Sequence, residues 1–314
     1  MNRKQTGHTG IGHLAGFAAY AIFGFNIIFC KDIANGGVLP PIALFTFRAL
    51  GAGLLFWLLS LFLPKEKVAA KDFPAILGAS LLGLFVPQMT FLTAIGRTSP
   101  MDLSVINTIT PIMTMFFAAI FLHEPITFKK AGGVIVSFTG VIFLIFQSIH
   151  INNTGAQTSP SGVLLVILNS LSFALYLGIF RPLISRYRVV TFMKWMFLFS
   201  FLISLPFSAH SIASIEYRDI PTQILWEVGY LILFATFFAY FLIPLSQKHL
   251  RPTLISMYGY LQPIIATSIS IATGMDKLSW QKICAALMVF AGVAIVNQSR
   301  AAQPADISPT VEES

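Results

Sequence analysis

The stretch "PIMTMFFAAIFLHEP", residues 111–125, carries no charge before Glu124 and begins with proline, a residue that interrupts helices. When the chain is shifted by 152 residues, Pro111-Ile112 falls on Pro263-Ile264. The same shift aligns Pro100 with Pro252, Ser104 with Ser256, Glu124 with Asp276, Lys130 with Lys282, Phe138 with Phe290, and Gly140-Val141 with Gly292-Val293. One ungapped offset over about forty residues indicates an internal repeat.

The composition of the chain places this repeat in a membrane. Hydrophobic residues make up 56% of the 314 residues and charged residues only 10%, and the mean hydropathy is +0.79. An ordinary soluble domain has about 25% charged residues. The sequence therefore predicts an integral membrane protein.

Apolar runs long enough to cross about 30 Å of hydrocarbon recur along the chain. Ten such spans cover residues 13–30, 41–63, 73–95, 103–122, 131–146, 162–180, 191–207, 228–246, 254–273 and 282–296. The predicted fold is an all-α integral membrane protein with ten transmembrane helices. Because each half holds five spans, an odd number, the two halves form inverted-topology five-helix repeats.

The segments outside the spans complete the predicted organisation. Residues 1–12 form a cytoplasmic N-terminal segment, 13–149 the first repeat, 161–297 the second repeat and 298–314 a disordered cytoplasmic tail. With the N-terminus inside, fourteen of the twenty Lys and Arg residues fall in cytoplasmic segments and five in outer segments. Positive residues in short loops stay cytoplasmic, so both termini are expected to face the cytoplasm of a plasma or bacterial inner membrane. This bias explains the net charge of +8 without a nucleic-acid partner.

The repeated prolines predict a cavity between the halves. A proline inside a span frees the carbonyl four residues earlier, and here those carbonyls belong to Asn107 and Gly259. Freed groups are tolerated at membrane depth only where protein or a water-filled cavity satisfies them. Pro111 and Pro263 either kink helices for packing or mark a cavity and its gate, and their symmetric positions favour the cavity.

Polar groups inside the predicted spans are the candidates for the lining of this cavity. The uncharged ones are Asn26, Gln88, Asn107, Asn169, Tyr176, Tyr240, Tyr258, Tyr260 and Gln262. Any one of them is also typical of an interhelical hydrogen bond, worth about 0.6 kcal/mol on average. Arg48 lies inside the second span, where it either holds a substrate carboxylate or serves structure or gating. The predicted substrate-binding set is Asn26, Arg48, Gln88, Asn107, Tyr176, Tyr258, Tyr260 and Gln262.

Acidic residues avoid the middle of the predicted spans. Asp102, Glu124, Glu227 and Asp276 fall at predicted helix ends, where caps and interfacial pairs are typical. Proton relays in transporters are usually built from buried Asp, Glu or His. The sequence therefore favours facilitated diffusion or exchange over proton coupling.

Motifs of catalysis and metal binding are not found in the sequence. The chain has no GxGxxG, phosphate loop or HExxH motif, and its six histidines are scattered. We therefore expect no enzyme activity, no cofactor and no metal site. Spans five and ten carry few polar groups and contain small pairs such as Gly132-Gly133 and Ala285-Ala286, which suits scaffold helices or the face of a homodimer.

Several stretches carry a family resemblance. The first repeat contains "HEPITFKKAGGVIVSFTGVIFL" and the second "PIIATSISIATGMDKLSWQKICAALMVFAGVAIV". These segments, with "FGFNIIFCK" near residue 23 and "FRALGAG" from Phe47, resemble the EamA family of the drug/metabolite transporter superfamily. Phe23 stands where that family commonly has tryptophan, and Asp276 stands where the first copy has glutamate. The resemblance implies a two-repeat transporter of small metabolites, without naming the substrate.

Together these observations predict a transporter that exports or exchanges small polar metabolites, amino-acid-like or otherwise carboxylate-bearing, by alternating access. Its partners would be the small-molecule substrate and the lipid bilayer. The alternative within transport is efflux of drugs or organic cations, which needs a reachable carboxylate. A membrane sensor or enzyme that reuses the fold is a more distant alternative.

Overall fold

The computed structural model describes residues 3–122, 128–150, 158–275 and 279–298, and over these ranges the chain is helical and contains no strand. In the first half the α-helices are α1 (Arg3–Gly36), α2 (Pro41–Leu61), α3 (Phe73–Ser80), α4 (Val86–Ile95), α5 (Pro100–Asn107), α6 (Thr110–Leu122) and α7 (Phe128–His150). In the second half they are α8 (Pro160–Ile179), α9 (Arg181–Arg186), α10 (Val189–Ala213), α11 (Thr222–Tyr230), α12 (Ala239–His249), α13 (Pro252–Met257), α14 (Leu261–Ala272) and α15 (Trp280–Gln298). Glu124 and Asp276 lie outside the described residues.

Eight stretches of the described chain are long and apolar enough to cross a membrane. They are Gly10–Gly36, Pro41–Leu61, Ala70–Ile95, Pro100–Phe121, Pro160–Ile179, Val189–Ala213, Thr222–His249 and Leu254–Ala272. α7 and α15 occupy the predicted fifth and tenth spans, but their apolar stretches, Ala131–Gly140 and Ile283–Gly292, are shorter. The fold is therefore an all-helical, multi-pass membrane protein, and eight of the ten predicted spans meet this criterion.

The third and eighth spans each contain a π-helical segment. η2 (Leu81–Phe85) joins α3 to α4, and η4 (Leu231–Phe238) joins α11 to α12. The offset of 152 residues carries η2 onto residues 233–237, inside η4. Single π-helical turns in α-helices occur frequently at functional sites. The repeat thus extends to a backbone irregularity.

The fourth and ninth spans are interrupted at the repeated prolines. α5 stops at Asn107 and α6 begins at Thr110, directly before Pro111. In the second half, the 3₁₀ turn η5 (Tyr258–Tyr260) separates α13 from α14, which contains Pro263 in its first turn. The first turn of a helix tolerates proline because its N–H groups have no intrahelical acceptor. Both prolines therefore begin new helical segments instead of bending continuous ones.

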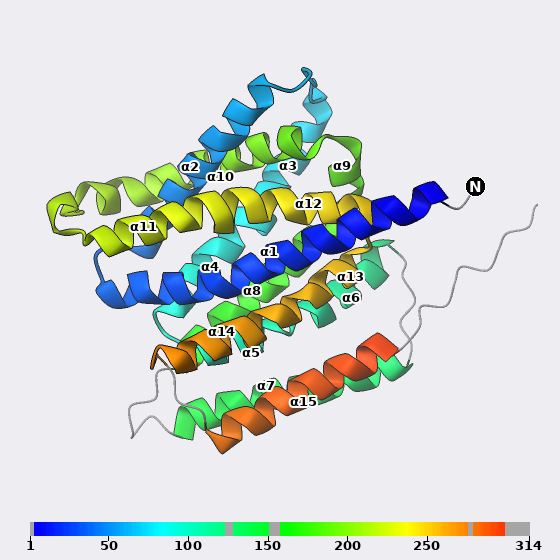
Figure 1. Ribbon diagram of the computed structural model, residues 1–314, viewed down its shortest axis with the longest axis vertical. Helices are drawn as coiled ribbons and strands as arrows, with labels where there is room; N and C mark the ends of the chain where they lie inside the picture. The colour runs from blue at the N-terminus through cyan, green and yellow to red at the C-terminus, as the bar shows by residue number, and fades with distance from the viewer. Residues whose placement is uncertain (1–2, 123–127, 151–157, 276–278, 299–314) are drawn as a thin grey trace, which may run out of the picture.

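Helices from both halves surround the centre of the bundle (Figure 1). α1 packs between α12 and α14, and α8 packs in the same way against α4 and α6. α2 packs against α10 toward one edge, whereas α7 and α15 pair along the opposite edge. A buried apolar core contains side chains from both halves. The centre of the molecule is therefore the junction of the two repeats.

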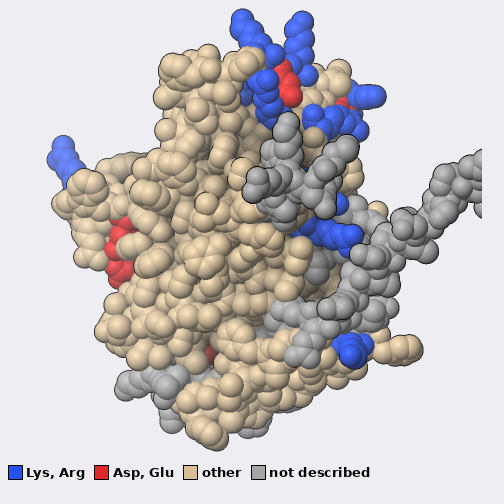
Figure 2. Space-filling view, turned by 45° about the vertical axis from the view of Figure 1, so that its right-hand side comes forward, with Lys and Arg blue, Asp and Glu red and all other residues tan. Residues whose placement is uncertain are grey.

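The surface is mostly uncharged. In the view of Figure 2, most Lys and Arg side chains lie on the side where α1 begins and α15 ends in Figure 1. Large apolar side chains are exposed along the described helices, among them Leu61, Phe128 and Trp226, which are 76%, 99% and 77% exposed. Exposed apolar surface on this scale is what contact with lipid requires.

α1 continues beyond the end of its apolar run. The first predicted span ended at Cys30, but the helix runs on through Lys31 and Asp32 to Gly36, and Gly37 follows with φ +66°. A glycine at positive φ is a common way to end a helix. Lys31 is only 6% exposed. Its Nζ donates to the carbonyl of Ile95, the last residue of α4, and to the carbonyl of Thr98, just after that helix. Charged residues therefore ended the hydropathy signal but not the helix.

Asp102 and Glu227 were both expected at helix ends, but only Asp102 lies in the first turn of a helix. Asp102 lies in the first turn of α5, and its backbone N–H donates to the N-cap hydroxyl of Ser99 at 3.1 Å. Glu227 was expected to precede the eighth span, but it lies well inside α11. Glu227 therefore does not cap this helix.

Candidate functional site

A cavity lies at the centre of the bundle, where the repeats meet. Its lining comes from α1, α4, α5, α6, α8, α12, η5 and α14, and consists of Tyr20, Phe23, Asn26, Ile27, Pro87, Gln88, Phe91, Asn107, Thr110, Asn169, Phe173, Tyr240, Gly259 and Gln262. Asn107 and Gly259, the two positions marked by the repeated prolines, are both in this set. The interrupted helices of the two halves thus border the same space.

Asn107 is the centre of a hydrogen-bond network in the lining. Its Nδ2 donates to Gln262 Oε1 at 2.9 Å, and its Oδ1 accepts from Ser170 Oγ at 2.9 Å. Thr110 Oγ1 also donates to Asn107 Oδ1, at 3.4 Å. Because Asn107 is the last residue of α5, the helix break places this amide between helices of both halves. One side chain therefore links α5 to α8 and α14.

Gln88 and Tyr240 meet where the repeats join. Their numbers differ by 152, so they occupy equivalent positions, and Gln88 Nε2 donates to Tyr240 Oη at 2.7 Å. Equivalent residues of two symmetry-related units touch each other only close to the symmetry axis. This contact therefore places the pseudo-two-fold axis of the repeats at the cavity.

Two buried polar atoms of the lining have no hydrogen-bond partner among the described residues, the Tyr20 hydroxyl and Gln88 Oε1. Tyr20 is 3% exposed and Gln88 is 8% exposed. A buried polar group without a partner costs about 1–3 kcal/mol, so these atoms are available to water or to a bound molecule. The hydroxyl supplies a donor and the amide oxygen an acceptor.

The remaining walls of the cavity are aromatic and uncharged. Phe23 packs edge-on against Tyr20 and Tyr240, with ring centroids 5.9 and 5.7 Å apart. No lining residue that the structure describes carries a charge, and the described ranges contain no group of three His, Cys, Asp or Glu residues placed to hold a metal ion. About 60 Å³ of the cavity is open to the centres of water molecules, each of which needs about 10–15 Å³. This conformation accommodates a few waters or a very small solute.

The structure brings four of the eight predicted binding residues to the cavity, namely Asn26, Gln88, Asn107 and Gln262. Tyr176 is 1% exposed, and its ring packs tightly over Gly83 of η2. Tyr260 packs edge-on against Phe290 of α15, with ring centroids 6.4 Å apart. These two tyrosines therefore pack between helices, whereas the sequence analysis predicted them in the cavity lining.

Tyr258 and Arg48 also lie off the lining. The Tyr258 hydroxyl hydrogen-bonds to His13 Nδ1 of α1 at 2.6 Å. Arg48 is 1% exposed, its Nε donates to Thr236 Oγ1 of η4 at 2.8 Å, and its Nη1 lies 3.7 Å from Cys30 Sγ. This placement supports the structural or gating alternative for Arg48, since its contacts are with Thr236 and Cys30 and it is not one of the residues that line the cavity.

The aromatic part of the lining was not assigned from the sequence, because most phenylalanines of membrane helices face lipid or pack. A signal was nevertheless present in the spacing of residues along single helices. Tyr20 and Phe23 precede Asn26 at three-residue steps, and residues three or four apart lie on one helical face. Phe91 follows Gln88 by three residues, and Phe173 follows Asn169 by four. Asn169 and Tyr240, both polar candidates, line the cavity as well.

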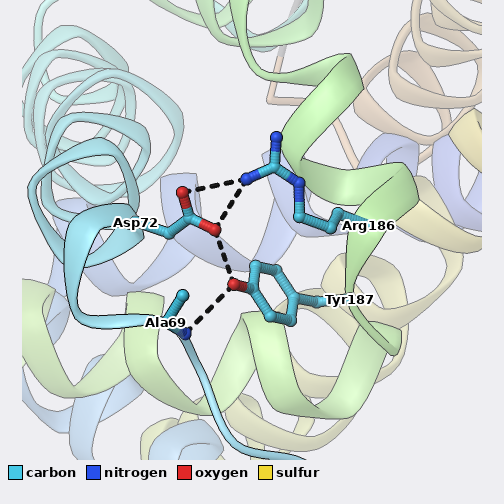
Figure 3. Close-up of polar contacts among 4 residues, drawn as sticks. All are labelled: Ala69, Asp72, Arg186 and Tyr187. Atoms are coloured by element: carbon cyan, nitrogen blue, oxygen red, sulfur yellow. Dashed lines mark hydrogen bonds and ion pairs between the residues drawn. The ribbon is translucent and has the colours of Figure 1, made fainter.

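A second polar cluster, the α3–α9 clasp, consists of Ala69, Asp72, Arg186 and Tyr187 (Figure 3). Arg186 Nη1 donates to both Asp72 oxygens at 2.9 and 2.7 Å, and the Tyr187 hydroxyl donates to Asp72 Oδ2 at 2.6 Å. The backbone N–H of Ala69 donates to the same hydroxyl at 3.2 Å. The hydrogen bond to Asp72 raises the pKa of Arg186 above its ordinary value. The clasp ties the connection before α3 to the end of α9.

Apolar helices in two repeated halves, joined around a central polar cavity, define a membrane transporter of the inverted-repeat class. The EamA-like transporter family matches this chain twice, over residues 10–146 and 160–298. The chain therefore belongs to the EamA-like transporter family.

Relatives named as transporters agree with this assignment, and a solved structure shares the fold. An uncharacterized transporter of Archaeoglobus fulgidus is 26% identical over 202 residues, which cover 64% of this chain and 68% of the relative. The uncharacterized transporter YetK of Bacillus subtilis is 26% identical over 235 residues, covering 72% of this chain and 68% of the relative. A chain of known crystal structure shares the fold with a TM-score of 0.64 at 15% identity, covering 93% of this chain and 97% of its own.

Proposed function

We propose that this transporter exports or exchanges a small polar metabolite of amino-acid-like character by alternating access. The observation that carries the proposal is the uncharged cavity at the repeat junction, with an unpartnered hydroxyl on Tyr20 and an unpartnered amide oxygen on Gln88. A zwitterion has no net charge, which suits a lining without charged residues. Its carboxylate can accept from the hydroxyl, and its ammonium group can donate to the amide oxygen beside aromatic faces.

The charge of the lining weighs on the alternatives. A metabolite with net negative charge would meet no cation in the described lining, since Arg48 is not one of the lining residues. An organic cation would meet no carboxylate there. We therefore place zwitterions ahead of other carboxylate-bearing compounds and ahead of cationic drugs, and transport ahead of catalysis.

The mechanism we propose uses the broken helices. Asn107 and Gly259 sit at equivalent breaks and both line the cavity, and Asn107 bonds across the junction to Gln262. Rocking of one repeat against the other about this junction would expose the cavity to each side in turn. Labels that report the two mouths should show one open at a time, and a cavity open to both sides at once would contradict the mechanism.

Orientation and assembly follow as part of the proposal. The gathering of Lys and Arg on the side where α1 begins supports cytoplasmic termini. α7 and α15 pack together at the edge of the bundle and still expose Ile135 and Leu287, which are 67% and 61% exposed. This edge is where we propose a homodimer would form.

The test is a metabolite profile of the medium around cells that overexpress the protein. The variants are Asn107→Ala and Gln262→Ala, with Thr139→Val on α7 as a control that does not line the cavity. Amino-acid-like compounds should accumulate outside with the native protein and the control, and not with the cavity variants. Accumulation of cations, or equal accumulation with every variant, would contradict the proposed substrate class or site.

A further inference from the structure

The end of α1 beyond its apolar run lies against α11 and contains a second set of charged groups. Gln223 Nε2, in α11, donates to Asp32 Oδ2 at 2.8 Å and to Glu227 Oε1 at 2.9 Å. One amide thus bridges two carboxyl groups from different helices. Glu227 is 6% exposed, whereas Asp32 is half-buried and Gln223 is exposed. The pair therefore reaches from the surface into the protein.

The two carboxyl groups interact with each other as well as with the amide. Because Gln223 Nε2 lies 2.8 Å from Asp32 Oδ2 and 2.9 Å from Glu227 Oε1, the amide holds the two carboxyl groups close together. Two carboxylates close to one another disfavour each other's negative charge, and this favours the binding of one proton by the pair. Glu227 Oε2 is buried and accepts no hydrogen bond from the described residues. This oxygen is therefore the atom on which we place the proton.

The repeat shows that the fold does not require carboxyl groups at this place. Lys31 Nζ donates to the Thr98 carbonyl at 2.8 Å, and Arg181 Nη2 donates to the Leu250 carbonyl at 3.5 Å. The two acceptors, Thr98 and Leu250, are 152 residues apart and so occupy equivalent positions of the repeats. Lys31 and Arg181 are therefore equivalent. By this alignment the counterpart of Asp32 is Pro182, and by the offset of 152 the counterpart of Glu227 is Ala75.

The charged and titratable groups around Glu227 lie on three helices. Asp32 and Cys30 of α1 interact with Glu227 itself, and Arg48 of α2 contacts Cys30. Lys31 is the neighbour of Asp32 along α1, and Tyr230 follows Glu227 by three residues in α11. Lys31 directs its ammonium group to the Ile95 and Thr98 carbonyls, at 3.0 and 2.8 Å. The Cys30 thiol interacts electrostatically with both Arg48 and Glu227, so it lies near the buried guanidinium group and near the carboxyl pair.

A path of contacts joins this pair to the cavity. Glu227 shares the continuous helical stretch Thr222–His249 with Thr236 and Tyr240. Thr236 accepts from the buried Arg48, and Tyr240 accepts from Gln88 in the cavity lining. Arg48 also contacts Cys30, whose thiol interacts with Glu227, so the pair is linked through Cys30 to the guanidinium group that is bonded to the π-helical segment of that stretch.

We propose that Asp32 and Glu227 form a proton-binding site that holds one exchangeable proton between two carboxyl groups and couples the transporter to a proton gradient. A proton from a hydronium ion binds a carboxylate oxygen, and the charge of the pair changes from −2 to −1. The coupling part of this inference rests on the proposed function. It replaces the expectation of uncoupled exchange, which assumed that Glu227 lies at a helix end.

Infrared spectroscopy of the full chain in lipid nanodiscs tests the shared proton without any substrate. The native protein should show the C=O stretch of a protonated carboxyl group at neutral pH, and Glu227→Gln and Asp32→Asn should both lose it. Asp219→Asn, in the exposed η3 turn (Tyr217–Asp219), is the matched control and should keep it. Glu227→Asp, which retains a carboxyl group, should keep a band and guards against loss by misfolding. A native protein without the band, or a band that survives both pair variants, would overturn the proposal.

Proteoliposomes with an imposed pH gradient test the coupling, with a mixture of the common amino acids as the probe. Flux by the native protein should rise with the gradient, and Glu227→Gln should exchange amino acids at a rate that no longer responds to it. Native flux that ignores the gradient would overturn the coupling. Absence of any amino-acid flux would contradict the proposed substrate class, while the infrared result still decides whether the pair holds a proton.

Discussion

Equivalent contacts at the two ends of the bundle differ in chemistry. At one end Arg186 donates to both oxygens of Asp72 in the α3–α9 clasp. The offset of 152 residues relates Asp72 to Ile224, and the alignment of Lys31 with Arg181 relates Arg186 to Gly36. At the other end the Ile224 side chain lies beside Gly36. A charged contact in one repeat is thus an apolar contact in the other.

In the centre of the molecule, too, equivalent positions of the two repeats carry different side chains. Both repeats have a π-helical segment and a helix break at equivalent positions. The side chains differ, because Asn107 at one break corresponds to Gly259 at the other, and Gly83 in η2 corresponds to Ala235 in η4. The repeat therefore preserves the backbone features that shape the cavity, while its hydrogen-bonding groups are asymmetric.

Making the two π-helical segments alike should have the largest effect. A Cβ atom at Gly83 would lie 2.5 Å from the Tyr176 ring, whereas Ala235 is accommodated with no exposed area in the second repeat. Overpacking of a core costs about 1–3 kcal/mol, so Gly83→Ala should lower the free energy of unfolding by about that amount. Unfolding in mixed detergent micelles would measure it.

The control for this substitution is Gly259→Ala, because a Cβ atom there would meet Tyr20 Cε1 at an ordinary 3.5 Å. Its free energy of unfolding should change by less than about 0.5 kcal/mol. Equal losses for the two alanine variants would show that the packing of the repeats does not differ as the structure indicates.

Replacing the amide at the first break should have the next largest effect. Asn107→Ala removes the partner of both Gln262 and Ser170. The loss of these hydrogen bonds should lower the free energy of unfolding by about 1 kcal/mol. Gly259, at the equivalent break, has no side chain that could take over these bonds. The same unfolding assay measures the change, with Thr139→Val as the control, and an unchanged stability would remove Asn107 from the centre of the network.

Much of the architecture was predictable from the sequence, because it depends on hydropathy and on the internal repeat. Hydropathy located the spans, and the shift that aligns Pro111 with Pro263 located the breaks. The π-helical segments were not predictable, because Leu81–Phe85 is as apolar and as helical in composition as its surroundings. The end of α1 was placed too early because hydropathy does not register that Lys31 finds backbone acceptors on another segment.

The site could be predicted only in part, for a similar physical reason. Asn26, Gln88, Asn107 and Gln262 line the cavity, and all are amides in helices that surround the axis. The tyrosines divide differently, because an aromatic ring with a hydroxyl suits either a cavity or a packed interface. Tyr20 and Tyr240 face the cavity, whereas Tyr176 covers Gly83. Whether a tyrosine lines the cavity or packs depends on the residue it meets on another helix, such as Gly83 for Tyr176. The pattern of residues along one helix does not reveal that neighbour.

The contact on the repeat axis allows a smaller and more exact test. Tyr240→Phe removes the acceptor of Gln88 Nε2, and interhelical hydrogen bonds in membranes contribute about 0.6 kcal/mol on average. The single substitution should lower the free energy of unfolding by about that amount. In the background of Gln88→Met the same change should cost nothing further, because the bond is already absent. Strict additivity of the two substitutions in this double-mutant cycle would show that the two side chains are not coupled.

The clasp should give the smallest effect and the clearest difference between the two ends. The Arg186 side chain is 55% exposed, so dissolved salt screens its attraction to Asp72, whose side chain is 10% exposed. Arg186→Gln should lower the thermal midpoint slightly at low salt and not measurably at high salt. Asp72→Asn should cost more at both salt concentrations, because it also weakens the hydrogen bond from Tyr187. Ile224→Val, at the equivalent apolar contact, should have an effect independent of salt. A salt-independent loss in Arg186→Gln would mean that the guanidinium group acts through packing, and that the two ends of the bundle are held together in the same way.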